Sequence, residues 1–189
     1  MQRHVQKYRI RKLWPLETET FRRHLLRLDP ETRQFRFGTP VNDNFLNAYA
    51  ETAFRIGTVV YGAFIGPEMY ASAELRSLHA LGDEMAEAAF VVETAHRHHG
   101  LGSALMDRMI TAAQNRAIHQ LHMICARENQ PMQKLGEKFG VGLHRRGRER
   151  TVGLGDGLMR GLPFGGATHA VDRAGDVRHA LQAGRAMRI

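Results

Sequence analysis

Residues 89–109 read AFVVETAHRHHGLGSALMDRM, and this stretch determines the fold that the sequence predicts. The run Met85 to Val92 is apolar enough for a strand that is buried at its C-terminal half. Leu101 to Ala117 follows with apolar residues at helical spacing and a wide apolar face, which predicts a helix packed on a sheet. Gly100 and Gly102 lie between the two, so a strand runs through a glycine loop into a helix.

The flanking segments extend this unit into a mixed sheet of the α/β or α+β class. A further strand follows the helix, which completes a βαβ unit with an expected right-handed crossover and parallel pairing. The turn Gly66-Pro67-Glu68 predicts a hairpin before the unit. Strands are predicted at 56–65, 69–78, 85–92 and 119–126, helices at 17–28, 43–52, 101–117 and 131–139, an extended start at 8–14, and a polar connector that contains Arg33, Phe35, Arg36 and Phe37.

The overall composition indicates one soluble domain. The chain has 189 residues, of which 43% are hydrophobic and 24% charged, so it is neither disordered overall nor long enough for two large cores. The longest weakly polar run, Gly57 to Gly66, is about half of a membrane span. No secretory signal pattern is found at the N-terminus, and Cys125 is the single cysteine. We therefore expect a cytoplasmic protein without a membrane partner.

The positive charge is concentrated at the C-terminal end. The net charge is +8, and residues 141–189 hold 9 of the Arg and 10 of the 19 Gly with only 4 acidic residues. This segment has one aromatic residue, Phe164, and no reading motif, so no specific nucleic-acid partner is expected. It is either a genuine basic extension or the product of a reading-frame change in a GC-rich gene, and the nucleotide sequence would distinguish the two.

The glycine loop predicts an anion site. Backbone N–H groups at the start of a helix are unpaired and carry partial positive charge, and glycine lets an anion come close to them. Arg97, His98 and His99 add donors beside Gly100. An isolated Gly-x-Gly more often serves an ordinary turn, and this one lacks both the third glycine of the dinucleotide fingerprint and the Gly-Lys-Ser/Thr end of the Walker loop.

The residues from Arg97 to Gly102 match the R/Q-x-x-G-x-G/A signature of the GNAT N-acetyltransferase superfamily. The strand before the loop, the helix after it and the series Asn129, Met132, Leu135, Lys138 and Gly140 resemble the same family in order and spacing. The stretch LDPETRQFRFG, residues 28–38, resembles the start of bacterial GNAT domains related to protein-lysine acetyltransferases. The resemblance covers about residues 10–140 and implies a GNAT-like, mostly antiparallel sheet with a splayed, parallel-paired strand at the coenzyme A (CoA) site.

The resemblance implies direct acetyl transfer from acetyl-CoA, as co-substrate, to a primary amine. The acceptor is left open between a protein lysine and a small-molecule amine, and so is a homodimer. The glycine loop would bind the pyrophosphate, while the preceding strand and an asparagine would hold the pantetheine arm. The residues that would contact acetyl-CoA are Phe90, Val91, Val92, Arg97, His98, His99, Gly100, Leu101, Gly102, Ser103 and Asn129.

Family analogy places a general base on the strand before the loop, where Glu87 stands. Burial there would raise its pKa toward neutrality, as suits a base that accepts a proton from an ammonium group. Glu74 and Glu93 are the other candidates, and Glu87 is otherwise a surface residue at the start of its strand. Many family members have a Tyr general acid seven residues after the asparagine, but here that residue is Gly136. No general acid can be named.

Three further expectations follow. His96, His98 and His99 lack the spacing of a metal site, so no metal is expected. Residues 1–140 are predicted as the GNAT domain and residues 141–189 as an atypical segment that partly replaces the usual terminal hairpin, because 144–157 only faintly suggests strands. The missing Tyr leaves open an alternative function, a non-catalytic acyl-CoA-binding or sensor module on the same scaffold.

Overall fold

The computed structural model of the protein describes residues 8–77, 85–126, 128–139, 141–146 and 149–154. They form seven strands, β1 (Arg9–Lys12), β2 (Thr58–Ile65), β3 (Glu68–Ser77), β4 (Met85–Val92), β5 (Gln120–Ala126), β6 (Val141–Arg146) and β7 (Glu149–Leu154). The helices are α1 (Thr18–Arg27), α2 (Pro30–Phe37), α3 (Asp43–Thr52), α4 (Leu101–Gln114) and α5 (Gln130–Lys138), with short 3-10 turns η1 (Pro15–Glu17) and η2 (Thr94–His96).

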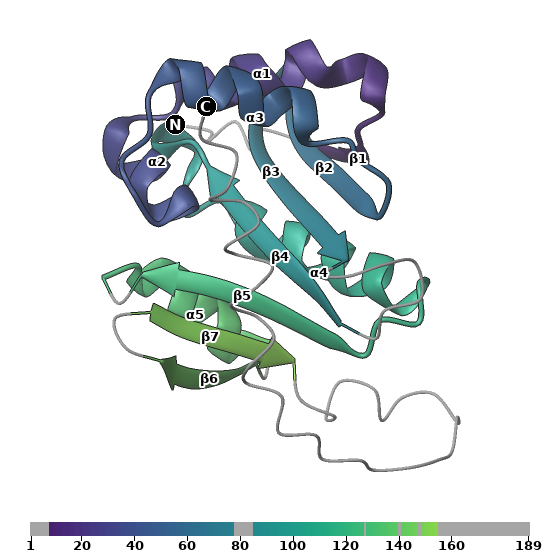
Figure 1. Cartoon of the computed structure of the whole chain (residues 1–189), viewed down its shortest axis with the longest axis vertical. Coiled ribbons are helices and arrows are strands. Elements are labelled where there is room, and N and C mark those ends of the chain that lie inside the picture. Colours follow the sequence, from purple (N-terminus) through teal and green to yellow (C-terminus); the bar gives the residue numbers. More distant parts are fainter. Residues whose placement is uncertain (1–7, 78–84, 127, 140, 147–148, 155–189) are drawn as a thin grey trace, which may run out of the picture.

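The seven strands form one mixed sheet in the order β1-β2-β3-β4-β5-β7-β6. Neighbouring strands are antiparallel except β4 and β5, which are parallel. This confirms the predicted mixed, mostly antiparallel sheet. Among the described residues, the pairing of β4 with β5 covers only Met85–Glu87 and Gln120–His122. Beyond these residues the strands separate, as Figure 1 shows, and β5 continues along β7 instead.

Two hydrophobic clusters pack on opposite faces of the sheet. One joins α4 and α5 to the strands through residues such as Leu105, Met109 and Leu121. The other lies under α1 and α3 and is built around Phe21 and Leu46. Helix α2 lies on the same face as α1 and α3, and it contacts both β4 and β5 where they diverge. The opening in the sheet therefore has α2 on one face and α4 and α5 on the other.

Helix α2 corrects the predicted polar connector. Asp29 accepts a hydrogen bond from the Thr32 backbone N–H at 2.8 Å, Pro30 occupies the first turn, and Gly38 ends the helix with a φ of 72°. All three are standard helix-boundary signals. The prediction missed the helix because its eight residues are too few to show an apolar period.

A terminal hairpin is present where the sequence only faintly suggests one. Strand β7 pairs with β6 on one side and with β5 on the other. Backbone hydrogen bonds need no particular side chains, so an Arg-rich segment can complete a sheet whose neighbouring strand is already in place. Residues 155–189 lie outside the described residues. The choice between a basic extension and a frame change in this segment therefore stays a prediction.

Other boundaries are close to the predicted ones. Helix α4 ends at Gln114 rather than at Ala117, whose φ of 55° is left-handed and incompatible with a continuing helix. None of the described helices has the length and apolar character needed to span a membrane.

Candidate functional site

The glycine loop connects the end of β4 to the start of α4 through two left-handed residues. His98 has a φ of 63° and Gly100 a φ of 78°. Gly100 is the N-cap of α4, and its carbonyl accepts a hydrogen bond from the Ala104 N–H at 3.0 Å. The N–H groups of the first helical turn have no partner within the helix, so they are available to an anion.

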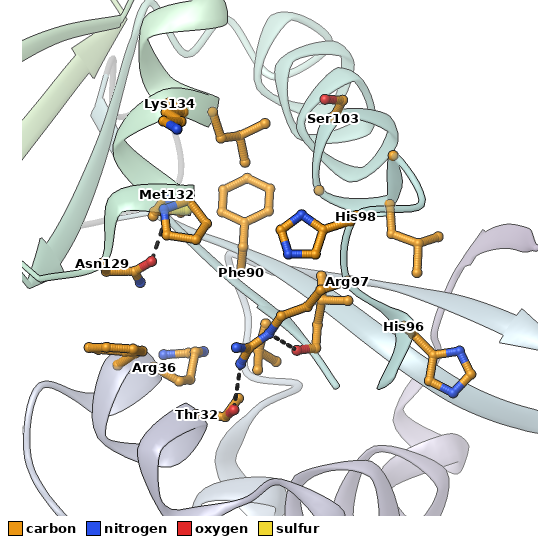
Figure 2. A pocket seen from close by; sticks show the side chains of 18 of the residues that line it. Thr32, Arg36, Phe90, His96, Arg97, His98, Ser103, Asn129, Met132 and Lys134 are labelled. Atoms are coloured by element: carbon orange, nitrogen blue, oxygen red, sulfur yellow. Dashed lines mark hydrogen bonds between the residues drawn. The ribbon is translucent and has the colours of Figure 1, made fainter. Parts of the chain in front are cut away.

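A cavity of about 370 Å³ opens beside this loop, where β4 and β5 separate (Figure 2). Ten of the eleven residues that the sequence predicted as acetyl-CoA contacts line it, all except His99. Glu87 is also absent from its lining. The predicted residues in the lining are Phe90, Val91, Val92, Arg97, His98, Gly100, Leu101, Gly102, Ser103 and Asn129.

Two helices contribute lining residues that are not among the predicted acetyl-CoA contacts. Helix α2 supplies Thr32, Phe35 and Arg36, and α5 supplies residues that include Lys134 and Lys138. The sequence predicts a connector at α2, so it does not indicate that these residues line a site. The spacing of Lys134 and Lys138, four residues apart on a predicted helix, was a usable signal for two cations on one face.

Among the described residues, the cavity lining carries positive charge and no carboxylate side chain. Its cationic residues are Arg36, Arg97, Lys134 and Lys138. Lys138 Nζ donates a hydrogen bond to Ser103 Oγ at 3.0 Å, which joins α5 to the first turn of α4. The arrangement suits an anionic ligand that spans from the glycine loop toward α5.

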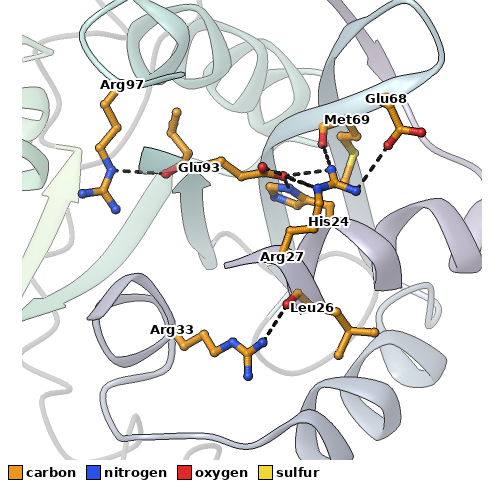
Figure 3. A network of polar contacts seen from close by, with 9 residues as sticks. His24, Leu26, Arg27, Arg33, Glu68, Met69, Glu93 and Arg97 are labelled. Carbon is orange, nitrogen blue, oxygen red and sulfur yellow. Dashed lines mark hydrogen bonds and ion pairs between the residues drawn. The ribbon is translucent and has the colours of Figure 1, made fainter. Parts of the chain in front are cut away.

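Arg97 connects the loop to α2. Its Nη2 donates to Thr32 Oγ1 at 2.5 Å and its Nε to the Val92 carbonyl at 3.2 Å (Figures 2 and 3). Thr32 Oγ1 in turn donates to Asp29 Oδ2 at 2.7 Å, and Thr94 Oγ1 donates to the same oxygen at 2.6 Å. We call Asp29, Thr32, Thr94 and Arg97 the Asp29 latch.

The Asp29 latch holds its carboxylate ionised. The hydrogen bond from Thr94 is the largest cause, and together with those from Thr32 it lowers the pKa of Asp29 to about 2. The guanidinium of Arg97 adds to this shift. The latch thus fixes the start of α2 against the loop, and it directs the Arg97 side chain to a structural role beside the expected anion site.

Comparison with known proteins now identifies the family. The sequence model of the acetyltransferase (GNAT) family matches residues 12–141, more than two thirds of the chain. The chain belongs to the GNAT acetyltransferases. The resemblance seen in the glycine loop is thereby confirmed. A search among curated proteins finds no match to this chain.

Solved GNAT structures share the fold at low sequence identity. The GNAT domain of PAT from S. lividans is 20% identical, with a TM-score of 0.67 over 81% of this chain and 98% of that one. The PaiA N-acetyltransferase of Thermoplasma acidophilum, in complex with coenzyme A, is 14% identical, with a TM-score of 0.59 over 78% and 98%. YncA of Salmonella typhimurium, with acetyl-CoA, is 17% identical, with a TM-score of 0.59 over 87% and 99%.

The three candidate bases have different surroundings. Glu87 is partly buried and is the last residue of β4 paired with β5. Glu74 is buried, and both of its carboxylate oxygens accept hydrogen bonds. Burial would raise its pKa, but the charges of Arg36 and Arg76 outweigh this and lower it. A carboxylate held in that way is a poor proton acceptor.

Two side chains of α1 bind the Glu93 carboxylate, as Figure 3 shows. Its Oε1 binds His24 Nδ1 at 2.8 Å and accepts from Arg27 Nη2 at 2.9 Å. Burial would raise the pKa of Glu93, but the hydrogen bonds from His24 and Arg27 outweigh burial and lower it. Cationic partners thus hold both Glu74 and Glu93 as carboxylates, and Glu87 as the base stays a prediction.

The remaining site predictions concern a general acid and a metal. Gly136 is a buried residue of α5, so this position offers no hydroxyl group. Within the described ranges, no three His, Cys, Asp or Glu side chains come together in a way that could hold a metal ion.

Proposed function

We propose that this GNAT domain transfers the acetyl group of acetyl-CoA to a primary amine in the cytoplasm. The observation that carries the proposal is the position of the cavity. It starts at the glycine loop and the N-terminus of α4 and continues into the opening between β4 and β5. That shape provides an anion site at one end and unpaired strand backbone at the other.

The pyrophosphate and the pantetheine arm of acetyl-CoA would each have a matching part of the cavity. The pyrophosphate would bind the N–H groups of the first turn of α4, with Lys134 and Lys138 neutralising further phosphate charge. The pantetheine amides would bind the backbone of Phe90 and Val92, on the side of β4 that β5 has left. Asn129 would lie beside the same arm. Binding of coenzyme A and acetyl-CoA by the PaiA and YncA structures supports this assignment.

The chemistry would be a direct transfer within a ternary complex. The acceptor arrives as an ammonium group, and Glu87 would take its proton, directly or through one water molecule. The neutral nitrogen then attacks the thioester carbonyl carbon and a C–N bond forms. The nitrogen gives up its second proton to water, and the C–S bond breaks to release the amide and the CoA thiolate. Since residue 136 is glycine, either the thiolate leaves as the anion or water protonates it.

The first experiment measures cofactor binding and turnover together. Acetyl-CoA at about 100 times its Kd should stabilise the protein by about 2.7 kcal/mol. Glu87→Gln should keep this stabilisation and lower kcat at least about 100-fold, which is the usual contribution of a general base. Glu51→Gln, on the exposed surface of α3, is the matched control and should leave both unchanged.

The outcomes separate two functions. Absence of stabilisation by acetyl-CoA would contradict the proposal. Stabilisation without acetylation of any amine would instead favour a non-catalytic acyl-CoA sensor, for which the glycine at position 136 is the specific argument. Full turnover by Glu87→Gln would exclude Glu87 as the base and leave the acetyltransferase activity standing.

A further inference from the structure

A tyrosine at the start of the first strand contacts the segment that leads into the glycine loop. Tyr8 lies just before β1, and its hydroxyl forms a hydrogen bond of 3.0 Å with His96 Nδ1. The two rings meet edge to face, with their centroids 6.0 Å apart. His96 ends η2 and lines the cavity, and Figure 2 shows its ring at the edge of the lining, turned away from His98. Tyr8 thus binds a cavity residue without lining the cavity itself.

His96 is held by β3 as well as by Tyr8. The ring of Tyr70, in β3, stacks on the ring of His96 with centroids 4.0 Å apart and an angle of 27° between the planes. The backbone follows the same path, since the His96 N–H donates to the Glu93 carbonyl at 2.8 Å and the Glu93 N–H donates to the Tyr70 carbonyl at 3.0 Å. A stacked ring and a directed hydrogen bond together fix the orientation of the His96 side chain.

The backbone of the loop needs such support at His98. This residue has a φ of 63°, a left-handed conformation that is unfavourable for a side chain with a Cβ and persists only where its surroundings hold it. His99, on the other side of it, is exposed, and its ring centroid lies 6.4 Å from that of Tyr8, within the range of aromatic contacts. Tyr8 therefore contacts a histidine before and a histidine after the left-handed residue. This position of His99 also explains its absence from the cavity lining.

The hydroxyl of Tyr8 does more than the packing of its ring requires. Tyr8 packs against the hydrophobic cluster that joins α4 and α5 to the strands, and a phenylalanine ring could do the same. Burial raises the pKa of Tyr8 and Tyr70 raises it further, so the hydroxyl stays neutral near pH 7. Because Tyr8 is partly buried, less water competes for its hydrogen bond. The bond to His96 is thus a directed contact that a substitution can remove by itself.

We propose that Tyr8 is a positioning residue for the cofactor, which holds the glycine loop through His96 and His99 in the conformation that binds the pyrophosphate of acetyl-CoA. The proposal rests on the proposed function, because it takes acetyl-CoA as the ligand of the loop. The N–H groups that would bind the pyrophosphate belong to the first turn of α4, directly after this loop. A shift of the loop would weaken those contacts and leave the pantetheine end of the cavity unchanged.

The first test compares two ligands that differ in the pyrophosphate. Tyr8→Phe removes only the hydroxyl, and we expect the Kd of acetyl-CoA, measured by isothermal titration, to rise about 3–10-fold, the usual value of one hydrogen bond. The Kd of S-acetylpantetheine, which lacks the pyrophosphate and is measured as a competitor of acetyl-CoA, should stay within about twofold. Tyr61→Phe, at a partly buried position of β2, is the matched control and should bind both ligands as the wild type does.

A loss of general stability would not distinguish between the two ligands. Unchanged affinity of Tyr8→Phe for acetyl-CoA, or an equal loss for S-acetylpantetheine, would overturn the proposal. Urea unfolding of the same variants shows whether each is folded. Should Tyr8→Phe fail to fold, His96→Phe decides, since it removes the partner atom and keeps a ring to stack on Tyr70. His96→Phe should then weaken acetyl-CoA and spare S-acetylpantetheine, and the opposite result would overturn the proposal.

The double variant tests whether Tyr8 acts through His96. If it does, Tyr8→Phe combined with His96→Phe should bind acetyl-CoA no more weakly than the weaker of the two single variants, because both remove the same hydrogen bond. Losses that multiply in the double variant would show that Tyr8 acts by another route and would contradict the assignment.

The proposed function and the role of Tyr8 fail in different ways. If the wild-type protein does not bind acetyl-CoA, the proposed acetyltransferase function is wrong, and the positioning role falls with it. If the wild type and Tyr8→Phe bind acetyl-CoA equally well, the proposed function stands and only the role of Tyr8 is wrong.

Discussion

Gly100 and Gly102 both belong to the glycine loop, but only Gly100 has a backbone conformation that favours glycine. Its φ is +78°, and a Cβ added there would meet no atom within 4 Å. Gly100→Ala should therefore destabilise the fold through backbone strain alone, by about 1–2 kcal/mol. At Gly102, in the first turn of α4, a Cβ would lie 3.5 Å from Leu135 Cδ2 of α5, an ordinary van der Waals contact. Gly102→Ala should be neutral or stabilising by up to about 1 kcal/mol.

Urea unfolding of the two variants measures this difference. Gly102→Ala is the matched control, since it adds the same methyl group two residues away. Equal loss of stability in both variants would show that the loop geometry around Gly100 is not as described.

At the scale of elements, the Asp29 latch links α2 to the glycine loop. Thr32→Val removes the hydroxyl that accepts from Arg97 and donates to Asp29. We expect the loop to lose its fixed position, so acetyl-CoA should bind about 5–30-fold more weakly, equivalent to about 1–2 kcal/mol. Isothermal titration with acetyl-CoA checks this. Thr52→Val, whose hydroxyl bonds within α3, is the control, and an equal effect there would contradict the latch.

The sequence predicted elements well where the apolar pattern was long. The bounds of β4 and α3 agree with the structure, because each has enough apolar residues to define a period. Helix α2 was not predicted, although Asp29, Pro30 and Gly38 mark its two ends. In segments of two turns, boundary signals predict a helix better than periodicity does, and here they would have predicted α2.

At the scale of the whole molecule, the two ends of the site differ in how far they were predictable. The predicted cofactor contacts that line the cavity lie in residues 90–103 and at Asn129, so a local motif reveals them. Arg36 also lines the cavity, and it belongs to a polar cluster in which Tyr49 and Glu74 bind it. This cluster draws on α2, α3 and β3, and no local pattern connects Arg36, Tyr49 and Glu74. Only the folded sheet brings them together. A linear sequence does not show which charged residues lie together in the fold, so it does not show which charges balance each other.

Another long-range pair, His24 with Glu93, makes the stability of the whole protein depend on pH. His24 of α1 is fully buried and binds Glu93, just after β4, at 2.8 Å (Figure 3). Burial lowers the pKa of His24, and the hydrogen bond and charge of Glu93 offset this only in part. Below the ordinary pKa of about 6.5 the unfolded chain therefore binds more protons than the folded one. Stability is complete above that pH and falls as the pH is lowered through it.

We expect the urea midpoint to drop between about pH 7.5 and 5.5, with this histidine contributing at most about 1.4 kcal/mol for each pH unit. His24→Gln should flatten the profile in this range, because glutamine does not titrate. His119→Gln, at an exposed position, should keep the wild-type slope. Glu93 does not produce the same signal, since its lowered pKa places its own loss of stability below about pH 4.5. An unchanged slope in His24→Gln would assign the pH dependence to other groups.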